Sequence, residues 1–346
     1  MSEMKLFDRA LRGTSRALGL VPGSVAGLVG RDRALNDRGQ RLDPQLGLLI
    51  WLSERLGLLM GKGSVEAARA SARRRFMLIG APPVSVAKIT DGVLDCGLAV
   101  RTYEQDAGAP TFVFLHGGGW AVGDLDTHDH LCRRLCVHAG WRVVSVDYPL
   151  APEHPCPAPQ EGVLAAFREI RAAVVAAGGD GARVAVGGDS AGGHLSAVLC
   201  HQLAAAGEAQ PGLQVLIYPA TDLRRLTASY RSLAQGYLLT AEDIAWFLEQ
   251  YQPPDVSAPA VSPLLAPDLT GLAPAVVATA GFDPLRDEGE AYARRLGDAG
   301  VWVKHLDETA MVHGYAQLDG VLPGADAALG RLLDAVRVGG EWGREA

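Results

Sequence analysis

A serine between small residues is the strongest chemical signal in this chain. The segment 188–192, Gly-Asp-Ser-Ala-Gly, follows the buried strand-like run 183–186 and precedes a helix-like run of small residues, 191–199. In this context a sharp strand-to-helix turn exposes the hydroxyl of a nucleophilic serine, here Ser190, and small neighbours are needed because the turn is strained. A chain with 42 glycines often matches this pattern by chance. The interpretation of Ser190 as a nucleophile therefore requires further evidence: anion-binding donors, a base and an acid elsewhere in the chain.

Three consecutive glycines supply candidate donors. They stand in 116–120, His-Gly-Gly-Gly-Trp, directly after the strand-like run 111–115. Such a run is costly unless the backbone itself must approach something closely. We predict that the N–H groups of Gly117 and Gly118, with that of Ala191 after the serine, form an oxyanion hole. A flexible turn with some affinity for phosphate is the alternative.

Two further candidates each lie in a loop that follows a strand-like run. Asp283 comes after the run 275–280 and just before Pro284, and His313 comes after the run 301–306. The spacing is 93 residues from Ser190 to Asp283 (283 − 190) and 30 from Asp283 to His313 (313 − 283). Loops that follow parallel strands meet at one edge of a sheet, so these side chains can converge on Ser190.

Other titratable side chains nearby are interpreted as structural. Asp189 is adjacent to the serine and is expected to point away from it. Asp287 and Glu288 lie inside the predicted helix after Asp283 and should be farther from the base. His116 is interpreted as a brace for the glycine loop, and His194 as a packing residue of the following helix.

These segments together resemble the bacterial hormone-sensitive-lipase-like esterases of the α/β-hydrolase fold. The resemblance extends from 116 to 314 and rests on the segments 116–120, 147–155, 188–193, 283–287 and 313–314. It implies that Ser190 is the nucleophile, His313 the base and Asp283 the acid that orients it. It also implies the same oxyanion hole of Gly117, Gly118 and Ala191.

The chain departs from the family pattern at three positions. Pro149 replaces a usual arginine, Cys156 a usual aromatic residue and Tyr315 a usual phenylalanine. None of the three is a member of the predicted triad. The departures therefore affect the expected substrate preference and local packing, and not the expected reaction.

The order of elements predicts an α/β fold. Helical patterns separate most of the later strand-like runs, which predicts a mainly parallel sheet with helices on both faces. The predicted strands are 84–89, 97–103, 111–115, 142–146, 183–186, 214–217, 275–278 and 301–306.

The chain is divided here into a catalytic domain, 84–346, and an N-terminal helical region, 1–83, in which the role of 1–40 is unclear. Ser64 is a predicted N-cap of a helix that runs to about Leu78. The family builds a lid from N-terminal helices, so the resemblance implies that this region is a cap. The segment 223–267, with a predicted helix start at Thr240, is a possible second cap piece. The lid segments 42–60 and 237–248 are rich in Leu, Trp and Phe and predict a closed apolar pocket.

Composition narrows the range of partners. The chain has 346 residues and a net charge of −7, so no basic surface for nucleic acid is expected. No apolar run is long enough to span a membrane, and no clear signal peptide is present, which favours a cytoplasmic location. A small-molecule ester is the expected partner, without stable membrane insertion, and a homodimer is possible.

No cofactor and no metal site are predicted. The number of cysteines is odd, at five, and none shows Cys-x-x-Cys spacing, so buried free thiols are expected. A zinc site at His128, His130 and Cys132 is disfavoured because residues two apart do not share a helix face.

Three functions remain in competition. The first is a serine carboxylesterase that hydrolyses short- to medium-chain acyl esters through an acyl-serine intermediate. An amidase or formamidase can use the same triad, because both reactions pass through a tetrahedral oxyanion. A non-enzymatic receptor of hydrolase fold is disfavoured by the presence of Ser190, Asp283 and His313. The triad does not distinguish an ester from an amide.

Overall fold

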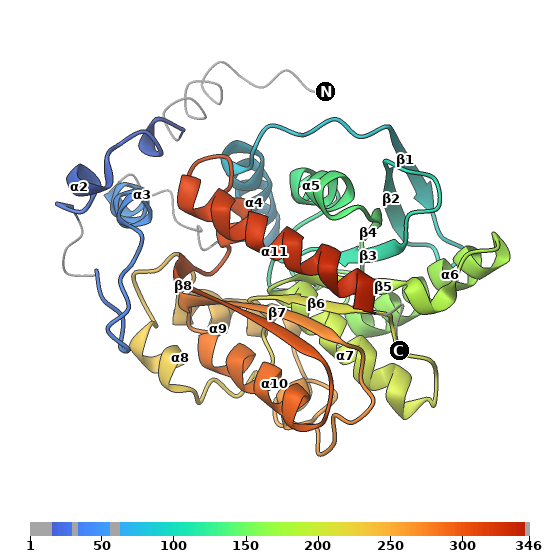
Figure 1. The fold of residues 1–346 in the computed structure, drawn as a ribbon. Helices are drawn as coiled ribbons and strands as arrows, with labels where there is room; N and C mark the ends of the chain where they lie inside the picture. The colour runs from blue at the N-terminus through green and yellow to red at the C-terminus, as the bar shows by residue number, and fades with distance from the viewer. Residues whose placement is uncertain (1–15, 30–33, 56–62, 343–346) are drawn as a thin grey trace.

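The computed structural model describes residues 16–29, 34–55 and 63–342. A central sheet of eight strands carries the fold (Figure 1), in the order β1-β2-β4-β3-β5-β6-β7-β8. The strands β1 and β2 and the strands β2 and β4 pair antiparallel, and every other neighbouring pair is parallel. The predicted α/β architecture with a mainly parallel sheet is confirmed. The strands are β1 Lys88–Val93, β2 Ala99–Glu104, β3 Thr111–Leu115, β4 Arg142–Val146, β5 Ala185–Asp189, β6 Gln214–Ile217, β7 Ala275–Phe282 and β8 Val303–Val312.

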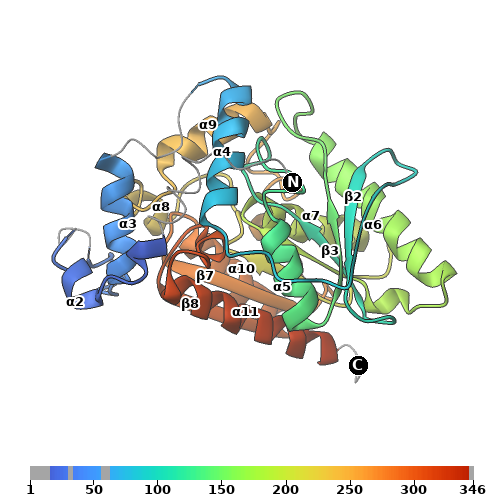
Figure 2. The ribbon, with the colours of Figure 1, turned by 90° about the horizontal axis from the view of Figure 1, so that it is seen from above.

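Helices cover both faces of this sheet, as Figures 1 and 2 show. The helices α5 Asp129–Ala139 and α11 Pro323–Trp342 lie on one face, and α6 Ala158–Ala176, α7 Ala191–Ala205 and α10 Arg286–Asp298 lie on the other. The remaining helices are α2 Gly23–Ala26, α3 Pro44–Arg55, α4 Val65–Ile79, α8 Ala228–Ser232 and α9 Ala241–Tyr251, with short 3₁₀ turns η2 Gly181–Arg183, η3 Pro263–Leu265 and η4 Tyr315–Gln317.

Alternating side chains of the central strands fill two separate cores. In β3, Phe112 and Phe114 pack with α5 and α11, whereas Val113 and Leu115 pack on the side of α6 and α7. All five residues of this strand are buried. Burial on both faces explains why the sequence of the central strands is a continuous apolar run.

The two strands at the edges of the sheet differ from their predicted bounds. The first begins at Lys88 and continues to Val93, instead of covering 84–89. The last begins at Val303 and continues to Val312, six residues beyond the predicted end at 306 (312 − 306). β1 is largely exposed and β8 mixes exposed with buried residues, so their pairing with β2 and β7 sets their length where the apolar pattern is weak.

Local signals place the helix starts. The side chain of Ser64 accepts a hydrogen bond from the Ala67 N–H at the start of α4. Thr240 and Asp243 form a reciprocal capping box at the start of α9. Both predicted caps are confirmed, and each satisfies backbone donors that the first helical turn leaves unpaired.

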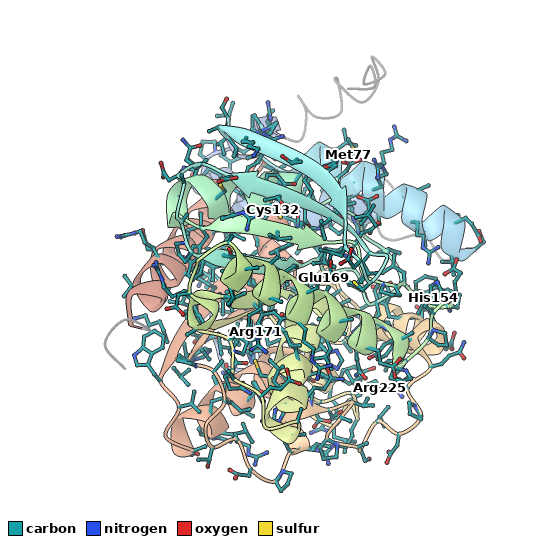
Figure 3. All side chains as sticks on the ribbon, turned by 90° about the vertical axis from the view of Figure 1, so that its right-hand side faces the viewer. Met77, Cys132, His154, Glu169, Arg171 and Arg225 are labelled. Carbon is teal, nitrogen blue, oxygen red and sulfur yellow. The ribbon has the colours of Figure 1, made fainter. Side chains whose placement is uncertain are left out.

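A side chain of α6 fixes a turn at the edge of the sheet, and three of the cysteines are buried in the core. Glu169 lies on α6 (Figure 3). It accepts hydrogen bonds from the N–H groups of Asp95 and Cys96, at 2.6 and 3.0 Å, and so fixes the turn between β1 and β2. Cys132, Cys136 and Cys200 are buried free thiols, whereas Cys96 is exposed. Within the described ranges, no helix combines the length and the hydropathy that a membrane span requires.

A glycine contact between β3 and α7 gives a testable prediction. A Cβ at Gly192 would lie 1.9 Å from the Leu115 carbonyl oxygen, so Gly192→Ala should lower the free energy of unfolding by more than about 3 kcal/mol. A Cβ at Gly330, inside α11, meets no atom within 4 Å. Gly330→Ala should therefore raise stability by about 0.5–1 kcal/mol. Urea denaturation of both variants measures this, and equal stabilities would contradict the steric account.

Candidate active site

Ser190 occupies a strained turn between β5 and α7. Its φ is 54° and its ψ is −114°, a backbone conformation that a residue with a side chain rarely adopts. The N–H of Ser190 donates to the Ile217 carbonyl at 2.8 Å. A Cβ at Gly188 or at Gly192 would lie 2.0 or 1.9 Å from the Leu115 carbonyl oxygen. The two glycines of the motif are therefore required because this turn packs directly on the end of β3.

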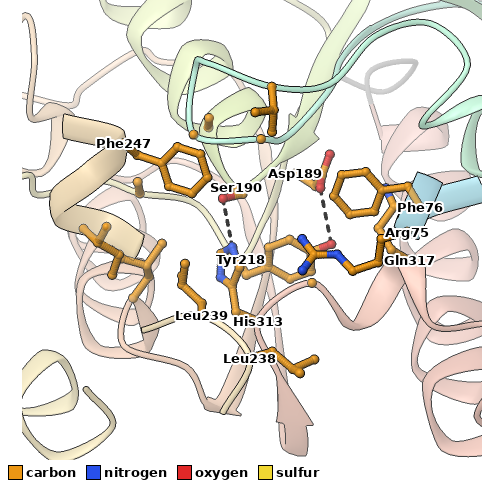
Figure 4. A pocket seen from close by; sticks show the side chains of 18 of the residues that line it. Arg75, Phe76, Asp189, Ser190, Tyr218, Leu238, Leu239, Phe247, His313 and Gln317 are labelled. Atoms are coloured by element: carbon orange, nitrogen blue, oxygen red, sulfur yellow. Dashed lines mark hydrogen bonds between the residues drawn. The ribbon is translucent and has the colours of Figure 1, made fainter. Parts of the chain in front are cut away.

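The structure brings Ser190, His313 and Asp283 together in a hydrogen-bonded chain. Ser190 Oγ lies 2.8 Å from His313 Nε2, shown by a dashed line in Figure 4. His313 Nδ1 lies 2.8 Å from Asp283 Oδ2. Asp283 is fully buried, and its other oxygen accepts the Leu285 N–H at 2.8 Å. The carboxylate thus directs Nδ1–H toward itself and leaves Nε2 free to accept a proton from the serine.

The rival carboxylates have other partners. Asp287 pairs with Arg38 and accepts the Ser229 N–H at 2.8 Å. Glu288 accepts the N–H groups of Thr221 and Asp222, and burial raises the pKa of Glu288 well above its usual value. The structure places neither of them against the imidazole of the base, as the sequence analysis expected.

The structure corrects the expectation for Gly117. Its N–H donates to Asp189 Oδ1 at 2.8 Å, so this amide is not available to a substrate oxyanion. Gly118 and Gly119, at φ 127° and 56°, line the cavity instead. Within the described chain, the N–H groups of Gly118, Gly119 and Ala191 have no acceptor. Gly119 is therefore a candidate donor that the sequence analysis missed, although the third glycine of the run was a visible signal.

The carboxylate of Asp189 holds the glycine loop, residues 116–120, in place. Besides Gly117, its carboxylate lies 3.1 Å from His128 Nε2 and 3.5 Å from the Tyr218 hydroxyl (Figure 4). Burial alone would raise the pKa of Asp189, but His128 and the Gly117 N–H outweigh it and hold that pKa below its usual value. The Tyr218 ring also contacts the His313 ring at a centroid distance of 4.7 Å. One buried carboxylate therefore connects the glycine loop with the surroundings of the base.

His116 braces the same loop. It is fully buried, and its ring stacks on Tyr148 at 4.4 Å. Its Nδ1 lies 2.9 Å from the Gly117 carbonyl, and the Tyr148 hydroxyl donates to the His116 carbonyl at 2.7 Å. Burial lowers the pKa of His116 to about 4. A neutral imidazole at this position keeps the loop backbone fixed without adding charge beside the serine.

His194 connects the far side of the loop to the cap. Its Nδ1 accepts the Trp120 indole N–H at 3.1 Å, and its Nε2 lies 2.8 Å from the Val261 carbonyl. Burial lowers the pKa of His194 to about 4 as well, so this ring is also neutral. Trp120 stacks on Tyr251 of α9 at 4.3 Å. These contacts hold α9 against the glycine loop.

A segment far upstream holds the strand ends that carry Asp283 and His313. Asn36 Nδ2 donates to the Gly281 carbonyl at 2.8 Å, two residues before Asp283. Asp37 pairs with the buried Arg286 at 2.8 Å. The N–H of Asp43 donates to the Ala310 carbonyl at 3.0 Å, near the end of β8. We call residues 36–43 the N-terminal clasp.

A cavity of about 510 Å³ lies above the serine. Helix α4 contributes Phe76, and the loop before α9 and α9 itself contribute Leu239 and Phe247 (Figure 4). Leu49 and Leu52 of α3 also line it. Of the predicted lid segments, 237–248 and the described part of 42–60 thus supply cavity wall, whereas 56–60 lies outside the described residues.

The candidate zinc ligands have separate partners. His128 faces Asp189, and His130 Nε2 lies 3.3 Å from Asp319. Across the described parts of the chain, no group of three or more His, Cys, Asp or Glu side chains could hold a metal ion.

Replacement of the buried carboxylate tests the hydrogen-bonded chain. Asp283→Asn should lower kcat by roughly 10⁴-fold, because an amide favours the wrong tautomer of His313. Asp287→Asn, the matched control, should change kcat little, because its carboxylate serves ion pairs with Arg38 and Arg286. Steady-state kinetics on folded variants measure both. A larger loss of kcat in the Asp287 variant would contradict the assignment.

Comparisons with known proteins agree with this geometry. A family model described as the α/β-hydrolase fold matches residues 112–317. The carboxylic ester hydrolase LipN of Mycobacterium tuberculosis (strain ATCC 25618 / H37Rv) is 41% identical, over 96% of this chain and 94% of the relative. An ethyl acetate hydrolase of Pseudomonas putida is 36% identical, over 86% and 98%. The ester-hydrolase EH1AB1, from the metagenome of Lake Arreo, superposes with a TM-score of 0.81 at 39% identity, over 87% and 99%. The chain belongs to the α/β-hydrolase fold family, in its hormone-sensitive-lipase-like branch.

Proposed function

We propose that the protein is a carboxylesterase that hydrolyses esters of small carboxylic acids through an acyl-serine intermediate. The hydrogen-bonded chain from Ser190 Oγ through His313 to Asp283, 2.8 Å at each link, is the observation that carries this proposal. The similarity to the carboxylic ester hydrolase and to the ethyl acetate hydrolase supports it.

In the first half of the reaction, Ser190 Oγ forms a bond to the ester carbonyl carbon while its proton passes to His313 Nε2. Asp283 accepts the Nδ1–H and stabilises the imidazolium. The carbonyl oxygen becomes an oxyanion and receives the N–H groups of Gly118, Gly119 and Ala191. Loss of one such donor typically costs about 100-fold or more in rate.

The bond between the carbonyl carbon and the alcohol oxygen then breaks. Nε2–H donates its proton to the leaving alcohol, and the acyl group remains on Ser190. In the second half, His313 takes a proton from water, whose oxygen attacks the acyl carbon. The tetrahedral intermediate collapses, the proton on Nε2 returns to Ser190 Oγ, and the carboxylic acid leaves.

Two parts of the chain cap the site in this proposal. The N-terminal region, 1–83, contributes α3 and α4, and the insert 223–267 contributes α8 and α9, above a catalytic domain of 84–346. Side chains of α3, α4 and α9 line the cavity, which supports the cap assignment. Because the capped cavity is finite, it should limit the length of the acyl chain.

Removal of the serine hydroxyl tests the nucleophile. Ser190→Ala should fold normally and lose ester hydrolysis, because no other atom can form the acyl intermediate. A fluorophosphonate should label the parent protein at Ser190, and peptide mass spectrometry should find no label in the variant. A folded variant with near-parental turnover would exclude Ser190.

The acyl-chain profile tests the capped cavity. We expect kcat/KM to rise from acetyl to a short or medium acyl chain, by roughly 0.8 kcal/mol per buried methylene, and to fall once the pocket is full. Measurement of kcat/KM on 4-nitrophenyl esters of increasing acyl length, beside the matching anilides, gives the profile. Emulsified triglyceride should be a poor substrate. A maximum at long chains, or a rate increase at a lipid interface, would contradict the capped cavity.

A further inference from the structure

An orphaned amide lies in the wall of the cavity. Gln317 belongs to η4, four residues after His313, and only 2% of it is exposed. Within the described chain, neither its Nε2 nor its Oε1 has a hydrogen-bond partner. A buried amide without partners is costly and rare in folded proteins, so its retention points to a ligand group that satisfies it. Gln317 lines the same cavity as Ser190.

A cationic side chain enters the cavity from the cap. Arg75 extends from α4 into the cavity and lies, like Gln317, on the α4 side in Figure 4. Its guanidinium carbon is 5.5 Å from the centre of the Phe76 ring. Burial lowers the pKa of Arg75, and the carboxylate of Asp243 opposes this effect. A guanidinium remains charged at any ordinary pH and carries several N–H donors, so it can bind an anion in addition to its contacts within the protein.

The opposite side of the cavity has a different character. Leu239, Ile244 and Phe247 supply its wall near α9, and Figure 4 shows Leu239 and Phe247 on the side away from Arg75. The cavity is therefore apolar on the α9 side and hydrogen-bonding on the α4 side. A substrate that fits both sides carries an apolar part and a polar, anionic part.

The acidic side chains of the cavity leave room for an anion. Glu288 has its pKa raised well above the usual value by burial, which favours its neutral form. Asp222 pairs with Arg224 at 2.8 Å. Asp189 faces His128 and the Gly117 N–H. Each of these three carboxyl groups has its own partners, and Asp243, whose charge acts on Arg75, is engaged in the capping box of α9.

We propose that Arg75 and Gln317 form a carboxylate-binding subsite, and that the preferred substrates are esters with a free carboxylate at the end of one half. The guanidinium and the Gln317 Nε2 would both donate to the carboxylate oxygens. This inference rests on the proposed esterase function and specifies its substrate class.

Matched pairs of alkyl esters test the subsite. For the acyl half, the probes are monoethyl succinate, glutarate and adipate, each beside the neutral ethyl ester of equal acyl length. For the alcohol half, the probe is 4-(butyryloxy)butanoate beside butyl butyrate. Acid release in a pH-stat gives kcat/KM for each ester, and the two sets identify which half of the ester faces Arg75.

Four variants separate the subsite from general effects. Arg75→Gln should lower kcat/KM for the acidic ester by about 30-fold, and Gln317→Met by several-fold, with neutral esters changed by less than about 3-fold. Arg75→Lys should restore part of the loss. Arg337→Gln removes an equal charge from a distant side chain that is 53% exposed, and it should leave both classes unchanged.

The outcomes distinguish the two proposals. Equal losses for neutral and acidic esters, or no dependence of either acidic probe on Arg75, would overturn the subsite. If the parent protein still hydrolyses neutral esters in a Ser190-dependent way, the esterase function stands. A folded parent protein that hydrolyses none of the esters, neutral or acidic, would overturn the esterase function itself.

Discussion

The close approach of one carbonyl group to two glycines determines the geometry of this site. The Leu115 oxygen, at the end of β3, leaves no room for a Cβ at Gly188 or Gly192, on either side of Ser190. Leu115 is also the residue before the glycine loop, so the same contact fixes the position of Ser190 relative to the N–H groups of that loop. The hydrogen bond from Gly117 to Asp189 is a second tether between the same two segments. Ser190 and the amides of the glycine loop are thus positioned by one packing interface and not by independent loops.

The central part of the fold could be predicted because it is buried on both faces. The strands at 111–115, 142–146 and 214–217 have the predicted bounds, since their apolar runs coincide with the buried segments. β5 and β7 are buried too but continue beyond their predicted ends at 186 and 278, where small residues replace the apolar run. Edge strands lack this signal. Lys304, Asp307 and Glu308 lie inside β8, where pairing with β7 sets the length of the strand and apolar periodicity does not.

The site was predictable where chemistry depends on residue type and less so where it depends on backbone direction. Serine, aspartate and histidine in the loops after parallel strands are visible in the sequence. Which glycine N–H faces the cavity depends on φ, and the donation from Gly117 to Asp189 spans 72 residues, so no local pattern shows it. The clasp is equally hidden, because Asp37 and Arg286 are 249 residues apart. No sequence pattern marks Gln317, because what distinguishes it is a side-chain amide that has no hydrogen-bond partner within the described chain.

The positions of the clasp and of the last two strands have a consequence for biosynthesis. A ribosome makes Ser190 and its glycine loop well before β7 and β8, which bring Asp283 and His313. Asn36, Asp37 and Asp43 emerge earlier still, yet their partners at Gly281, Arg286 and Ala310 are among the later parts of the chain. The clasp can therefore close only when β7 has paired with β6 and β8 with β7. A nascent chain thus carries Ser190 before its partners exist, and the hydrogen-bonded chain from Ser190 through His313 to Asp283 forms together with the final pairing of the sheet.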